Sequence, residues 1–125
     1  MSKKVVVSIL NPGEAAEHNG QTIHALKLAS KLKAAGADVV VVFEGKGVSW
    51  LPRFLDRSDD SHPFVKHYGY VFDEVRDAVV ACNMCAIRFD LRDSIAAADI
   101  PIKGEGKDHI DIAQYVLDGY QVINH

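Results

Sequence analysis

The chain has 125 residues, a formal net charge of −3 at pH 7, 48% hydrophobic residues and 25% charged residues. This length and composition predict a single domain, residues 1–125, that buries roughly two-thirds of the surface of its unfolded chain. The sequence has no block of Lys and Arg to neutralise phosphates, and apolar runs such as Val39–Phe43 are far too short to span a bilayer. We therefore expect neither nucleic acid nor a membrane as a partner.

The first half of the chain alternates apolar, β-branched runs with helical patterns. Lys4–Leu10 and Asp38–Phe43 lack the polar alternation of a half-exposed strand, which predicts strands buried on both faces. Between them the sequence predicts a polar loop, Asn11–Gly20, and a helix over Thr22–Ala35. The turn after the second strand is followed by an expected helix, Ser49–Leu55, which its serine caps.

The second half continues this alternation. A polar loop at 56–62 precedes an amphipathic helix at 64–75, and Asp77–Cys82 is the expected third strand. Apolar residues at helical spacing indicate a further helix after this strand: Met84, Ile87, Leu91 and Ile95. We also expect a short strand at Ile100–Lys103, a helix at Asp108–Leu117 and a final strand at Tyr120–Asn124.

Doubly buried strands separated by helices predict a three-layer α/β/α fold with a mostly parallel sheet of about five strands. The crossovers between such strands are right-handed. Ligand sites in sheets of this kind lie beyond the carboxyl ends of the strands. Three segments qualify by this rule: Asn11–Gly20, Glu44–Ser49 and the loop that contains Cys82.

Both cysteines of the chain lie in one segment, VVACNMCAIRF, at residues 79–89. Cys82 is expected to end the third strand, Asn83 to cap the next helix, and Cys85 to lie in the first turn of that helix. Unpaired backbone N–H groups collect at a helix start and favour an anion such as a thiolate. Lowering the pKa of a thiol to about 7 takes about 2 kcal/mol, and a helix dipole supplies only about 0.3–1 kcal/mol. Direct N–H bonds to the sulfur or a nearby cation must add the rest, and Arg88 and His109 are the candidate cations.

Several chemistries fit two thiols at this spacing. C-x-x-C near a strand-to-helix junction is typical of a thioredoxin-like dithiol, although here the first cysteine ends the strand. A zinc site is less favoured because none of the six histidines has the paired spacing of a ligand set, so we predict no metal and no cofactor. Sulfur carriage requires one accessible thiolate and no cofactor. In a purely structural interpretation both cysteines are small buried hydrophobic side chains.

The sequence also bears on compartment and on nucleotide binding. A disulfide between two cysteines only three positions apart would stabilise the fold little, which fits a reducing compartment such as the cytoplasm. The short apolar stretch near the N-terminus is not followed by an A-x-A site, so we interpret it as a strand and not as a signal peptide. The segment NPGEAAEHNGQT after it lacks both G-x-x-x-x-G-K-[ST] and G-x-G-x-x-G, so nucleotide or flavin binding is a weaker alternative.

In the order of its segments the chain resembles the DsrE/DsrF-like family, which includes sulfurtransferase subunits of sulfur-oxidation and tRNA-thiolation relays. The resemblance rests on an apolar first strand followed by KLKAAGADVVVVFEGKGV, VVACNMCAIRF and the C-terminal HIDIAQYVLDGYQVINH. It implies an α/β/α fold, trimers or hexamers, and a sulfur-accepting cysteine at the end of the third main strand. Cys82 matches that position, whereas Cys85 falls where relay proteins often have another residue.

The preferred hypothesis is a cytoplasmic, homo-oligomeric sulfur-relay protein that accepts sulfane sulfur on Cys82 and works with donor and acceptor proteins. In this hypothesis Asn83 and His109 help to hold the sulfur anion, and Cys85 is a candidate resolving thiol. The alternative is a non-catalytic scaffold or small-ligand-binding protein of the same fold, in which both cysteines are buried.

Overall fold

The computed structural model describes residues 3–125, so the first two residues of the expected domain lie outside the described part. Its elements in chain order are β1 (Lys4–Ile9), α1 (Ala16–Ala34), β2 (Asp38–Phe43), the 3₁₀ turn η1 (Gly45–Ser49), α2 (Trp50–Leu55), α3 (Pro63–Val75), the 3₁₀ turn η2 (Arg76–Ala78), β3 (Val79–Cys82), α4 (Asn83–Arg88), α5 (Arg92–Ala97), β4 (Ile102–Lys103), α6 (Ile112–Leu117) and β5 (Gln121–Asn124). Within the described residues no helix is both long enough and apolar enough to cross a membrane.

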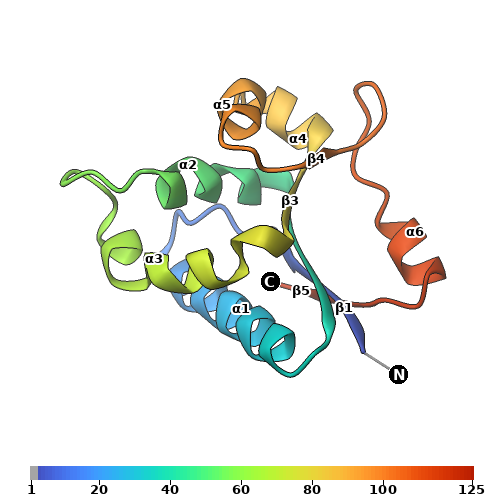
Figure 1. Ribbon diagram of the computed structural model, residues 1–125. Helices are drawn as coiled ribbons and strands as arrows, with labels where there is room; N and C mark the ends of the chain where they lie inside the picture. Colours follow the sequence, from blue (N-terminus) through green and yellow to red (C-terminus); the bar gives the residue numbers. More distant parts are fainter. Residues whose placement is uncertain (1–2) are drawn as a thin grey trace.

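The strands of residues 3–125 form one five-stranded sheet with the order β4-β3-β2-β1-β5 (Figure 1). Every neighbouring pair is parallel, which confirms the predicted sheet. The register places Val5 beside Val39 and Val41 beside Val79, so valines line up across the centre of the sheet. β3 is buried along its whole length, as a strand covered on both faces should be.

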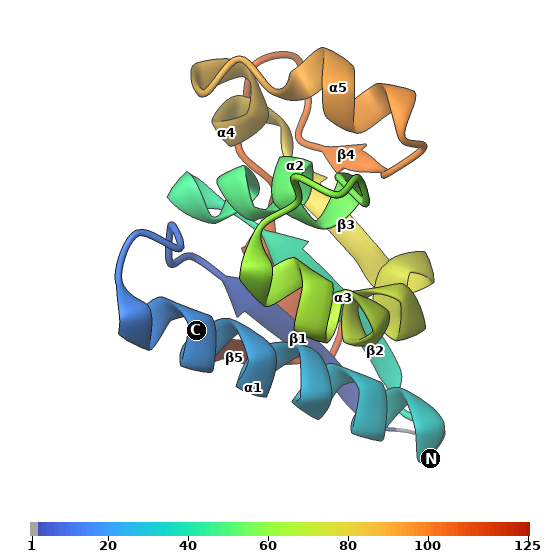
Figure 2. The same cartoon turned by 90° about the vertical axis from the view of Figure 1, so that its left-hand side faces the viewer.

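The direction of the chain connections decides which face each helix covers. From β1 to β4 every strand is added on the same side of the one before, so right-handed crossovers put the connecting helices on one face. α1, α2 and α3 cover this face (Figure 1 and Figure 2), and α4 and α5 lie beside the β4 edge. The return from β4 to β5 runs the other way, and α6 lies on the opposite face. The fold is therefore a three-layer α/β/α sandwich.

Aromatic side chains fix the first helical layer to the sheet. Phe43 of β2 contacts Phe54 of α2 and Phe72 of α3 edge-on, with ring centroids 6.4 and 6.3 Å apart. Phe54 and Phe72 stack on each other at 4.7 Å, and all three side chains are fully buried. Because each such ring removes about 150–250 Å² from water, this cluster anchors the whole connection between β2 and β3.

The first helix begins earlier than the sequence pattern predicts. We expected a loop over Asn11–Gly20, whereas α1 starts at Ala16. Ala15 has no side-chain oxygen to cap the helix, but the ring Nδ1 of His18 accepts hydrogen bonds from the N–H groups of Glu14 and Ala15. His18 is the third residue of the helix, so its ring bonds the N–H of the flanking residue Ala15 in the way that Glu or Gln does in a capping box. A histidine in that role is not a recognised start signal, which is why the sequence pattern missed this helix start.

The helix predicted after Cys82 is divided into two short helices. α4 ends at Arg88 and α5 begins at Arg92. Asp90 lies between them with φ of 57°, a left-handed conformation that a continuous helix excludes. The apolar residues that predicted one helix do lie in a helical region, but Met84 and Ile87 belong to α4 and Ile95 belongs to α5.

Two further helix starts differ from the prediction. Ser49 does not cap α2, because its hydroxyl donates to the carbonyls of Lys46 and Pro12 and ends the η1 turn instead. The last helix begins at Ile112 and not at Asp108, and the carboxylate of Asp111 caps it by accepting from the N–H of Gln114. Residues 104–111 are therefore free to form a loop beyond the end of β4.

Asn11 links the loop after β1 to two helices. Its Oδ1 accepts from the indole Nε1 of Trp50 at 2.9 Å, and its Nδ2 donates to the hydroxyl of Thr22 at 3.0 Å. Trp50 and Thr22 are fully buried, so neither has water as a substitute partner. A polar group left unpaired in such a place costs on the order of 1–3 kcal/mol.

We predict that Asn11→Ala lowers the free energy of unfolding by about 2 kcal/mol or more, because the Trp50 indole N–H and the Thr22 hydroxyl both lose their partner. Urea denaturation followed by circular dichroism measures the change. Asn124→Ala, at an exposed position of β5, is the matched control and should change stability by less than about 0.5 kcal/mol. Equal effects of the two substitutions would contradict this account.

Candidate functional site around Cys82 and Cys85

The two cysteines lie where β3 passes into α4. Cys82 is the last residue of β3 and the N-terminal flanking residue of α4, and Cys85 is in the first turn of that helix, as the sequence predicts. Both are free thiols and both are buried, with 1% and 5% of their surface exposed. The η1 turn and the loop after β4 pack against the two cysteines and also supply their hydrogen-bond partners.

Each sulfur accepts a hydrogen bond from a peptide N–H of a neighbouring loop. The N–H of Gly45, at the start of η1, donates to Sγ of Cys85 at 3.1 Å. The N–H of Ile110, in the loop after β4, donates to Sγ of Cys82 at 3.3 Å. Thiol sulfur is a weak acceptor, so each of these hydrogen bonds would strengthen if its sulfur were ionised.

His109 brings the loop after β4 into the site. β4 lies beside β3 and runs parallel to it, so the chain that leaves β4 emerges at the same edge of the sheet as Cys82. The ring Nδ1 of His109 lies 3.4 Å from Sγ of Cys82 and 3.5 Å from Sγ of Cys85. The imidazole itself is exposed, so it lies between the two buried sulfurs and solvent.

Asn83 holds this loop against the end of β3. Its Nδ2 donates to the carbonyl oxygens of Gly104 at 3.2 Å and Gly106 at 2.6 Å, and its Oδ1 accepts from Nε of Arg92 at 3.0 Å. The N–H of Met84 adds a bond to the carbonyl of Asp108 at 3.1 Å. Our expectation that Asn83 caps α4 is therefore wrong: Asn83 is inside the helix, and its amide is directed at the loop.

Gly104 is required by the close approach of this loop. Its φ is 130°, and a Cβ at this position would lie 2.3 Å from the carbonyl oxygen of Asp108 and 3.1 Å from Cβ of Asn83. Any larger residue at position 104 would force the backbone at Asp108 away from Gly104. The glycine thus lets residues 104–108 fold back tightly enough for His109 to reach the sulfurs.

The cysteine inside α4 is held as a neutral thiol. Burial is the first cause that raises the pKa of Cys85, the neighbouring Cys82 side chain is the second, and the result is a pKa of about 11. The N–H of Gly45 lowers this pKa, but the negative charge of Glu44 acts in the opposite direction. At neutral pH almost no Cys85 is ionised, so its thiol does not compete as a free nucleophile.

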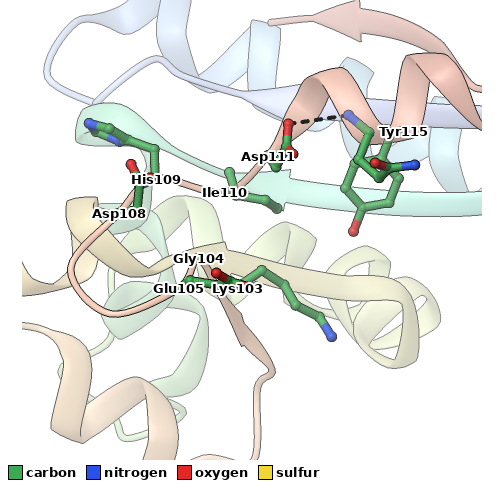
Figure 3. A pocket seen from close by; sticks show the side chains of 9 residues that line it. Lys103, Gly104, Glu105, Asp108, His109, Ile110, Asp111 and Tyr115 are labelled. Carbon is green, nitrogen blue, oxygen red and sulfur yellow. Dashed lines mark hydrogen bonds between the residues drawn. The ribbon is translucent and has the colours of Figure 1, made fainter.

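A pocket of about 600 Å³ adjoins the site on the α6 side. It is lined by Lys103, Gly104, Glu105, Asp108, His109, Ile110, Asp111, Gln114 and Tyr115. In Figure 3 the ring of His109 points away from Tyr115 and Asp111, so the imidazole and the body of the pocket lie on opposite sides of the loop. The cysteines are not part of this lining, and His109 and Ile110 separate them from it.

The structure brings together some of the predicted site residues and excludes others. His109, proposed as a partner of Cys82 without any knowledge of its position, contacts both sulfurs. The other candidate cation, Arg88, is exposed, and no hydrogen bond between it and either sulfur is found in residues 3–125. Arg92, at the start of α5, donates from Nε to Oδ1 of Asn83 and holds that side chain.

The three loops expected at the carboxyl edge of the sheet did not include the segment after β4, although His109 within it was a candidate. Glu44–Ser49 was correctly expected at this edge, since Gly45 contacts Cys85. Asn11–Gly20 does not provide a hydrogen bond to either sulfur, whereas the segment 104–111 contributes both His109 and Ile110. The signal was present: a strand at Ile100–Lys103 in a parallel sheet ends at the same edge as Cys82, so the residues after it belonged among the candidate loops.

Comparison with known proteins agrees with this fold. The model of the DsrE/DsrF-like family matches residues 3–125, and the chain therefore belongs to this family. The chain is also similar to "Uncharacterized protein MJ0733" of Methanocaldococcus jannaschii, with 29% identity over 101 residues that make up 81% of this chain and 77% of the relative. Membership of the family supports a sulfur-relay type of role in general terms.

We predict that Cys85 of the native Cys82→Ser variant reacts with iodoacetamide only at alkaline pH, because burial raises the pKa of its thiol toward 11. The rate of alkylation against pH should have its midpoint well above about 8.5, the ordinary value for a thiol. The same variant unfolded in urea is the control and should return the ordinary midpoint. A native midpoint at or below the unfolded one would contradict the assignment.

Proposed function

We propose that the protein carries sulfane sulfur as a persulfide on Cys82 and passes it to an acceptor protein. The observation that carries the proposal is the position of Cys82 Sγ between the ring Nδ1 of His109 and the N–H of Ile110. The ring Nδ1 of His109 can take the proton from the thiol, and the N–H of Ile110 can donate a hydrogen bond to the thiolate that results. Family membership supports the same general role.

The transfer needs no oxidant or cofactor. His109 Nδ1 accepts the proton of the Cys82 thiol, and the thiolate attacks the outer sulfur of a donor persulfide, R–S–SH. A new S–S bond forms on Cys82, the S–S bond of the donor breaks, and the leaving thiolate R–S⁻ takes up a proton as R–SH. Release to the acceptor is the same exchange in reverse, with an acceptor thiolate as the nucleophile.

The burial of Cys82 sets a condition on access. Its surface is 1% exposed, and the exposed imidazole of His109, on a loop outside the regular elements, contacts its sulfur. The proposal therefore requires that this side chain and its loop move to admit the donor. The donor thiol therefore approaches from the loop side, next to the pocket that His109 and Ile110 also line.

Cys85 has a second role in this proposal, as the resolving thiol. Attack of a Cys85 thiolate on the inner sulfur of the Cys82 persulfide would form a Cys82–Cys85 disulfide and expel HS⁻. The raised pKa of Cys85 keeps this thiol protonated at neutral pH, which protects the persulfide from internal discharge. Discharge becomes faster as pH rises toward the pKa of Cys85.

A non-catalytic scaffold of the same fold is the second candidate function, favoured by the burial of both cysteines. The two functions differ in whether native protein takes up sulfur at all. In either function we propose a homo-oligomer, as in the resemblance to relay proteins, and Val116 and Leu117 on α6 are 55% and 79% exposed and fit a surface that a second copy covers. We also propose the cytoplasm, where both thiols stay reduced.

We predict that reduced wild-type protein incubated with a low-molecular-weight persulfide gains the mass of one sulfur atom per chain, measured by intact mass spectrometry. Cys82→Ser should abolish the gain, and Cys85→Ser should keep it, since Cys85 is neutral and not the acceptor. His109→Gln should slow the uptake by roughly 100-fold, because it removes the proton acceptor. Sulfur retained by Cys82→Ser would contradict the proposal, and no uptake by wild type would favour the scaffold.

A further inference from the structure

We infer that Cys82, Cys85 and His109 form a binding site for Zn²⁺ with an open fourth coordination position. The side-chain donor atoms of these three residues all lie within 4.8 Å of one another. Two cysteines and one histidine are among the sets that hold Zn²⁺ in catalytic and transport sites. The sequence suggested no metal, because the ligand set is assembled from a helix start and a distant loop and not from a spaced pair of histidines.

The two sulfur–nitrogen distances match the edges of a zinc tetrahedron. With Zn–S bonds of about 2.3 Å, Zn–N bonds of about 2.0–2.1 Å and tetrahedral angles, sulfur and nitrogen ligands are about 3.5 Å apart. The ring Nδ1 of His109 lies 3.4 Å from one sulfur and 3.5 Å from the other, and the two sulfurs lie within 4.8 Å of each other. The imidazole is therefore already at ligand distance from both sulfurs, which lowers the ordering cost of binding.

The charges and the surrounding hydrogen bonds also suit this ion. Two thiolates neutralise the two positive charges of Zn²⁺, and the imidazole binds as a neutral ligand, so a buried site carries no net charge. The N–H groups of Gly45 and Ile110 already donate to the two sulfurs. Soft thiolate ligands in this number select Zn²⁺ over Mg²⁺ or Ca²⁺, which prefer oxygen.

The residues around the ligands hold them in place. The loop that carries His109 is fixed at its base by Asn83 through the carbonyls of Gly104 and Gly106, and the N–H of His109 donates to Oδ1 of Asp108 at 2.8 Å. Supporting contacts of this kind orient metal ligands and raise affinity. Because the described residues supply three ligands and the imidazole is exposed, we expect water or an incoming thiolate to fill the fourth position.

The metal site does not require the proposed sulfur transfer, but it uses the same sulfur atoms. A Cys82 thiolate bound to Zn²⁺ shares its charge with the ion and is a weaker nucleophile than a free thiolate, so zinc-loaded protein is expected to take up sulfur more slowly. Zinc and sulfane sulfur therefore compete for the same sulfur atom, and each is expected to weaken the binding of the other.

Titration calorimetry with Zn²⁺ on the reduced full-length protein tests the inference. We expect one ion per chain for wild type, at least roughly tenfold weaker binding for His109→Ala and for Cys85→Ser, and unchanged binding for the control His67→Gln, an exposed histidine on α3. Co²⁺ should give a thiolate-to-cobalt charge-transfer band in wild type that Cys85→Ser weakens. Circular dichroism checks that each variant is folded. If Cys85→Ser does not fold, the comparison of wild type with His109→Ala tests the site on its own.

Less than one ion per chain, or equal binding by wild type and His109→Ala, would overturn the metal site. Zinc binding is measured without a sulfur donor, so its failure is separate from a failure of the transfer chemistry. If zinc-free wild type takes up sulfur but zinc does not bind, only the metal site is lost. If zinc binds at His109 and zinc-free protein takes up no sulfur, the site stands and the sulfur-carrier function falls.

Discussion

The site depends on the hydrogen bonds by which Asn83 holds the loop after β4 to the end of β3. One side-chain amide reaches the carbonyls of Gly104 and Gly106, and Arg92 holds that amide in its orientation. The short strand β4 ends well before His109, so these bonds fix the base of the loop, and the N–H groups of Met84 and Ile110 fix the part next to His109. With them, an exposed imidazole is placed against two buried sulfurs, which is the arrangement that the proposed proton transfer and metal binding require.

Much of the fold could be predicted from the sequence, because its strongest signals are physical requirements of parallel sheets. The runs of valine in β1, β2 and β3 have no polar alternation, and a strand of that kind must be covered on both faces. Element boundaries were less predictable. The start of α1 depends on a histidine ring that bonds to preceding N–H groups, and the break between α4 and α5 depends on Asp90 adopting a left-handed conformation.

The candidate site was predictable in part. A cysteine at the end of a buried strand, followed by a second cysteine one helical turn later, predicted that both thiols lie at the carboxyl edge of the sheet, and the structure has them there. The role of Asn83 was not predictable, because its partners are backbone carbonyl groups some twenty residues away. Every residue has such a carbonyl group, so the sequence does not indicate which of them a side chain will bind. The same holds for the raised pKa of Cys85, which comes from burial that only the packed fold creates.

The most direct test of this account is amide hydrogen exchange at Ile110, measured by nuclear magnetic resonance in wild type and in Asn83→Ala. In wild type this N–H donates to the sulfur of Cys82 and should be protected. Removal of the Asn83 amide should release the loop and bring exchange at Ile110 close to the rate of an unstructured chain, while the amides of β1 stay protected. An Ile110 amide that exchanges equally slowly in both proteins would contradict the central role of Asn83.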